Sequence, residues 1–115
     1  MPDQQLLHLA AEAAMRAGLK LECPDELDGV YVSRCSGRNG YTWNPLEDDG
    51  DALRLAVELG VKLRWHPVLR QALAWIPIDI EIRVGIEDCQ SAGAATRRAI
   101  VLAAAEIGKS MQEKH

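Results

Sequence analysis

The sequence predicts an α+β fold, in which an antiparallel-rich sheet of about 4–6 short strands packs with three helices in a sandwich-like arrangement. Three segments carry the apolar periodicity of amphipathic helices, and short segments between them alternate apolar and polar residues as strands do. Turn-forming glycine, proline and asparagine separate these segments closely, which favours hairpins. The predicted order is α-β-β-β-α-β-β-β-α. The 115 residues are expected to form a single domain, 1–115.

The first helix is predicted over about 3–17, where Asp3 can cap the start and Gly18 ends the apolar stripe. A short strand within 19–23 follows it. A hairpin is then predicted over about 29–43, because β-branched and aromatic residues flank an Asn-Gly pair that favours the positive φ angles of a tight turn.

The second helix is predicted over about 49–59 and ends at Gly60. Either Asp48 or Asp49 can act as its N-cap, and Asp51 lies in its first turn. Negative charge is favourable at this end of a helix, because the unpaired backbone N–H groups there carry partial positive charge.

Three more strands are predicted over about 61–66, 72–76 and 78–86, and the third helix over about 91–109. The first and last of these strands alternate apolar and charged residues, so each should have one solvated face. If these two strands are neighbours, opposite charges can pair between them, with Lys62 and Arg64 facing Asp79 and Glu81.

Composition argues against several functional classes. With 13 basic and 17 acidic residues the net charge is −4, which disfavours binding to nucleic acid or to an anionic membrane. No apolar run approaches the ~18 residues of a membrane-spanning helix, and no signal-peptide pattern is present, so a cytoplasmic location is expected. Cys23, Cys35 and Cys89 lack zinc-ligand spacing and are expected to be free thiols, with a Cys23–Cys35 disulfide as the alternative.

The acidic run from Glu47 to Asp51 is the main candidate for chemistry. Its acids are contiguous, and the position six after Gly50 is Ala56, whereas a calcium-binding EF-hand loop needs a glutamate there. We therefore expect a helix start, with no bound metal or cofactor. The alternative is a small hydrolase or metal-dependent enzyme that uses Asp48, Asp49 and Asp51, or His66 with a carboxylate on a neighbouring strand.

No residue is assigned a catalytic role, and the sequence instead suggests an interaction surface. Trp43 and Asn44 precede a helix start beside a proline, and tryptophan often anchors binding surfaces. Val101 lies off the main apolar stripe of the third helix, so that helix should contact something on a second side. A protein partner or a homodimer is expected, through the sheet face opposite the helices or the outer side of the third helix.

Two segments, Trp43–Ala56 and Ala94–Gly108, resemble small bacteriophage and prophage proteins grouped as the phage ABA (α-β-α) sandwich domain. The resemblance implies a phage or prophage origin, a location in the cytoplasm of a bacterial host, and helices on both sides of a sheet. Members of that family are uncharacterised, so it implies no site residue. The leading hypothesis is a non-enzymatic protein-interaction or regulatory module.

Overall fold

The computed structural model describes residues 2–22, 30–32, 41–77 and 80–113. Within these ranges the chain forms three α-helices and six strands in the predicted order, which confirms the α+β class. The helices are α1 (Asp3–Ala17), α2 (Asp49–Leu59) and α3 (Ala92–Glu113), and a short 3-10 helix, η1 (Ile86–Asp88), precedes α3. The strands are β1 (Leu21–Glu22), β2 (Val30–Val32), β3 (Tyr41–Trp43), β4 (Lys62–His66), β5 (Gln71–Ile76) and β6 (Ile80–Gly85).

The strands form two antiparallel sheets instead of one. The small sheet has the order β1-β2-β3 and the larger sheet the order β4-β5-β6. β2 and β3 pair as the predicted hairpin requires, while its turn lies outside the described residues. In the larger sheet two successive hairpins place β5 in the centre, so Lys62 and Arg64 are not neighbours of Glu81. The charge pairing expected between these strands is therefore wrong for Glu81, and Asp79 lies outside the described residues.

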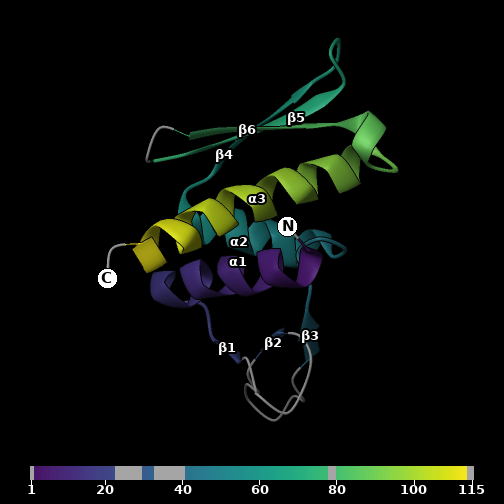
Figure 1. Cartoon of the computed structure of the whole chain (residues 1–115). Helices are drawn as coiled ribbons and strands as arrows, with labels where there is room; N and C mark the ends of the chain where they lie inside the picture. Colours follow the sequence, from purple (N-terminus) through teal and green to yellow (C-terminus); the bar gives the residue numbers. More distant parts are fainter. Residues whose placement is uncertain (1, 23–29, 33–40, 78–79, 114–115) are drawn as a thin grey trace.

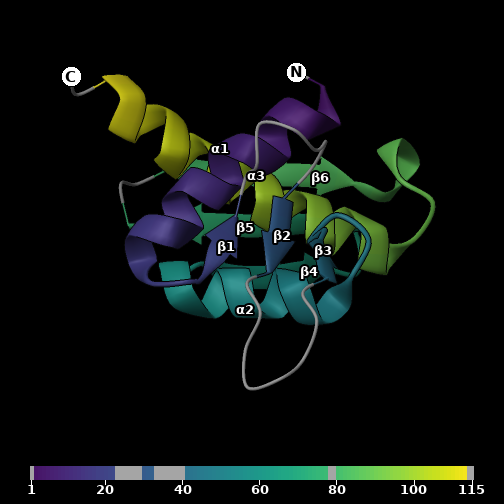
Figure 2. The same ribbon diagram turned by 90° about the horizontal axis from the view of Figure 1, so that it is seen from below.

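Helix α3 lies at the centre of the molecule (Figure 1). The larger sheet covers one side of α3, and α1 and α2 pack on the other side, with the small sheet beyond them. Seen from below, α1 and α2 flank α3 (Figure 2). The family resemblance implied helices on both sides of a sheet, but in the described ranges the larger sheet has helical cover on one face only.

Two apolar cores meet at α3. The first joins the three helices to Trp43 and includes Val101, and the second lies between α3 and the inner face of the larger sheet. On α3, Ala104 and Ala105 are buried in the first core. The alanines at positions 95, 99 and 103 are buried in the second. Ala105 is 4% exposed because its side of α3 packs against the other helices.

The helix ends differ in part from expectation. Gly18 and Gly60 end α1 and α2 with φ angles of 115° and 66°, as predicted. Asp3 does not cap α1, because Pro2 occupies the N-cap position, and the Asp3 carboxylate instead accepts a hydrogen bond from Arg98 Nη1 at 3.1 Å. Helix α3 runs to Glu113, beyond the predicted end at 109.

The last turns of α3 are held against α1. Gln112 Nε2 donates to Glu12 Oε2 at 2.9 Å across the two helices. One turn earlier, Gly108 lies so close to the backbone of Leu9 that a Cβ on Gly108 would be 2.9 Å from the Leu9 carbonyl carbon. The absence of a side chain at Gly108 is what permits this approach of the two helices.

Candidate functional site

The outer face of the larger sheet carries no described helix, and its residues follow from the register of the strands. The inner face places Ala72, Ala74 and Val84 against α3, so alternate residues point outward. The clean alternation of β4 and β6 predicted one solvated face, and this face is that one. In the described ranges its larger side chains are Lys62, Arg64, His66, Gln71, Leu73, Trp75, Glu81 and Arg83.

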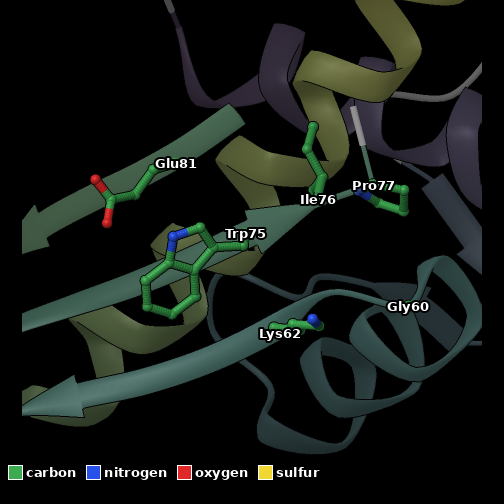
Figure 3. Close-up of a pocket in the computed structure, with 6 residues that line it drawn as sticks. All are labelled: Gly60, Lys62, Trp75, Ile76, Pro77 and Glu81. Carbon is green, nitrogen blue, oxygen red and sulfur yellow. The ribbon is translucent and has the colours of Figure 1, made fainter. Parts of the chain in front are cut away.

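Trp75 lies on the central strand of this outer face, in the row where β4 and β6 begin. It pairs in register with Lys62 on one side and Glu81 on the other. These three residues, with Gly60, Ile76 and Pro77, line a hollow of about 860 Å³. Figure 3 shows the half-buried Trp75 indole lying over the sheet between Lys62 and Glu81. The hollow thus offers an aromatic surface with a cation on one flank and a carboxylate on the other.

The next row of the outer face is basic. Leu73 pairs in register with Arg64 and Arg83, and it is only 6% exposed although no described helix covers it. Long arginine side chains on both neighbouring strands can cover such a residue with their methylene stems. Arg83 Nε also donates to Glu81 Oε2 at 3.1 Å. In the described part of this face, three permanent cations therefore accompany one carboxylate.

His66 does not form the acid–base pair considered in the sequence analysis. Its Nδ1 accepts a hydrogen bond from the Leu69 N–H at 3.1 Å, which holds the turn between β4 and β5. His66 pairs in register with Gln71, and Gln71 pairs with Gly85 of β6. Glu81 lies four residues away from Gly85, or about 13 Å along the strand, which is too far for proton transfer between these side chains.

The aspartates at the start of α2 do lie together, but they bind their own backbone. The Asp48 carboxylate accepts from the Asp51 N–H at 2.8 Å, so Asp48 is the N-cap. Asp51 is buried, and its two carboxylate oxygens accept from the Asn44 N–H at 3.0 Å and from Arg54 Nη2 at 2.9 Å. These contacts fix the 44–48 loop onto the helix.

Arg97 of α3 ties the same loop to the helical layer. Its Nε donates to the Leu46 carbonyl oxygen at 2.9 Å, and its Nη1 lies 2.6 Å from Asp49 Oδ1. The acidic run therefore contains one cap, one buried anchor and one surface ion pair. Nothing in the described ranges brings three or more His, Cys, Asp or Glu side chains together as metal ligands.

We expect Asp48→Ala to lower the free energy of unfolding by about 1 kcal/mol, which corresponds to a loss of about 4 °C in Tm. The variant removes the acceptor of the Asp51 N–H and leaves the helix start uncapped. Thermal and urea denaturation followed by circular dichroism measure the change. A stability equal to that of the unmodified chain would mean that Asp48 is free for another role.

Of the three residues from which an interaction surface was predicted, Trp43 and Val101 are buried. Trp43 is 3% exposed and Val101 is fully buried, because both belong to the core among the three helices. The second contact of α3, inferred from Val101, is with the helices of its own chain. Asn44 is half-buried and organises the loop, since its side-chain oxygen accepts from the Leu46 N–H at 3.1 Å.

Sequence reasoning missed Trp75. The strand was expected, but Ala72, Leu73 and Ala74 are all apolar and hide the alternation that would have assigned Trp75 to a face. One signal was present. Trp75 has the opposite parity to Ala72 and Ala74, and small residues on one parity are typical of close contact with a helix.

No family model, curated protein or solved structure matches this chain. The resemblance to phage proteins therefore stays a prediction. Within the described ranges, no helix has both the length and the apolar character needed to cross a bilayer. Of the three cysteines, Cys89 is free and half-buried, and Cys23 and Cys35 lie outside the described residues.

Proposed function

We propose that this protein is a non-enzymatic interaction module that binds a protein partner on the outer face of the β4–β6 sheet. Following the resemblance of its motifs, we place it among phage- or prophage-encoded proteins that act in the cytoplasm of a bacterial host, where it regulates the partner it binds. The observation that carries the proposal is Trp75, which lies on a sheet face that no described helix covers and lines a hollow of about 860 Å³.

The chemistry of the hollow indicates the kind of partner. Tryptophan in a concave, polar-rimmed setting is the residue type that most often dominates binding energy at protein interfaces. The described part of this face has a net positive charge, with three cations (Lys62, Arg64 and Arg83) and one carboxylate (Glu81). The whole chain, in contrast, has a net charge of −4. A segment that inserts an apolar side chain beside Trp75 and presents acidic groups to the rim fits this face.

An enzyme is supported less well. A hydrolase needs a carboxylate or histidine to converge with a second group on an open cleft. Asp48 and Asp51 accept from backbone N–H groups of the loop and helix, and His66, at the far end of β4 from the hollow, accepts from its own turn. Among the described residues that line the hollow at Trp75, only Glu81 carries a carboxylate, and Trp75 separates it from Lys62.

Trp75→Ser should abolish selection of ligands from a displayed peptide library. Panning on the unmodified protein is expected to enrich peptides with one large apolar residue flanked by Asp or Glu. Their Kd should rise roughly thirtyfold (about 2 kcal/mol) for the serine variant, because the variant removes the apolar anchor. Isothermal titration calorimetry with synthetic peptides measures this change.

The matched control is Val68→Ser, which removes an apolar side chain that is 82% exposed in the β4–β5 turn, away from the hollow. This variant should retain the affinity of the unmodified protein. The proposal fails if panning yields no consensus, or if the selected peptides bind the Trp75 and Val68 variants equally well. Selection of single-stranded RNA instead of peptides by the same face would also overturn it.

A further inference from the structure

The two edges of the larger sheet differ in what they present. β4 and β6 each pair with β5 on one side, and no described strand pairs with the other side of either. An unpaired edge exposes backbone N–H and C=O groups that can bind another strand, and proteins commonly block such edges with charged side chains. The side chains that would face each other if two copies paired at the same edge show which edge is blocked.

The edge of β4 repels a second copy of itself. Its outward side chains are Lys62, Arg64 and His66. Antiparallel pairing of two β4 strands about Arg64 would place Arg64 opposite Arg64 of the other copy, and Lys62 opposite His66. Like charges directly opposite each other destabilise a strand pair, so the facing Arg64 side chains protect this edge.

The edge of β6 is complementary to itself. In the segment Ile80-Glu81-Ile82-Arg83-Val84, antiparallel pairing about Ile82 places Glu81 opposite Arg83 of a second copy, and Arg83 opposite Glu81. The same register places Ile80 opposite Val84 on the inner face. Glu81 and Arg83 already form an ion pair within one chain, with N···O at 3.1 Å. Two copies would therefore join four alternating charges in one network.

We propose that the protein forms a two-fold symmetric dimer through antiparallel pairing of its β6 strands about Ile82, which creates a continuous six-stranded sheet. A two-fold contact of this kind closes on itself, so association stops at the dimer. The half-buried side chains of Ile80 and Ile82 gain apolar neighbours on the inner face, beside α3. The outer faces of both copies, each with its Trp75, then lie on the same side of the joined sheet.

Charge reversal tests the register. Glu81→Arg and Arg83→Glu each turn two attractive cross-strand pairs into repulsive ones, because the symmetry doubles every contact. Each is expected to raise the dimer Kd at least about tenfold. The double variant Glu81→Arg/Arg83→Glu restores alternating charge and should restore the dimer. Sedimentation equilibrium reports whether the mass is 12.6 kDa or twice that value.

The matched control is Arg64→Glu, an equivalent charge reversal on the outer face of β4, which should leave the dimer Kd unchanged. A second measurement does not depend on charge. In a background with Cys23, Cys35 and Cys89 replaced by serine, Ile82→Cys should form a disulfide-linked dimer on oxidation, since facing Cα atoms in a strand pair lie about 4.5–5.5 Å apart. Leu63→Cys on β4, which is 40% exposed in the unmodified chain, should not.

The proposal is overturned if the unmodified protein sediments as a monomer up to submillimolar concentration. It is also overturned if the double variant fails to recover the dimer while remaining folded by circular dichroism, or if Leu63→Cys crosslinks as well as Ile82→Cys. These outcomes are independent of peptide binding at Trp75. Failure of the dimer proposal would therefore not contradict the proposed function. Failure of peptide binding at Trp75 would likewise not contradict the dimer.

Discussion

Gly108→Ala should be among the most destabilising single-methyl additions in the described part of this protein. The added Cβ would lie 2.9 Å from the Leu9 carbonyl carbon and closer still to its oxygen. Both are backbone atoms, so α1 and α3 must separate to relieve the overlap. Overpacking costs about 1–3 kcal/mol where side chains can adjust, and we expect about 3 kcal/mol or more here. The Tm should fall by more than about 10 °C.

Gly93→Ala in the same helix is the matched control. A Cβ there would meet only side-chain atoms, with Arg97 Nη1 the nearest at 3.3 Å. Because alanine is the better helix former, this variant should be neutral or slightly stabilising. Urea denaturation of both variants gives the comparison. Equal stability of the two would show that α1 and α3 do not approach as closely as the structure indicates.

Asp51→Ala should have the second large effect. The Asp51 side chain is 2% exposed, and it accepts both the Asn44 N–H and Arg54 Nη2. Truncation leaves these donors without their carboxylate and opens a void at the helix start. Breaking such charge-assisted hydrogen bonds costs about 3 kcal/mol, or about 10 °C in Tm.

Asp49→Ala is the comparison for Asp51. Asp49 is 86% exposed and pairs with Arg97 at the surface, so its loss should change the free energy of unfolding by less than about 0.5 kcal/mol. Differential scanning calorimetry of both variants separates a buried anchor from a surface ion pair. If Asp51→Ala were as stable as Asp49→Ala, the carboxylate cluster would have to be reconsidered as a functional group.

The positions of the elements were predictable because they depend on local signals. Gly18 and Gly60 end helices through their own backbone conformation, and Asp48 caps α2 through a contact three residues away. The β2–β3 hairpin was also predictable from its turn residues, but the order of strands in the larger sheet depends on contacts that no local pattern records. The central position of β5, and hence the separation of Lys62 from Glu81, follows only when both hairpins are assembled.

The candidate site was missed for the same reason. The central strand β5 carries apolar residues on both faces, with Leu73 and Trp75 on the outer one, so its sequence does not indicate which side a helix covers. Trp43 was a reasonable candidate, since its setting before a helix start resembles a surface anchor. The helices bury Trp43, however, whereas Trp75 is half-buried on the outer face of the larger sheet. The difference in burial between Trp43 and Trp75 can be seen only in the tertiary structure.

Because both cores rest on α3, neither can be completed before that helix is present. Residues 95–103 of α3 pack against the sheet, and residues 101–108 pack against α1. Helix α1 begins nearly a hundred positions earlier in the chain. During translation, the apolar surfaces of α1, α2 and the hairpins therefore stay exposed to solvent until α3 has left the ribosomal exit tunnel. Contacts of such sequence separation are slow to close, and chaperones have that interval in which to bind the nascent chain.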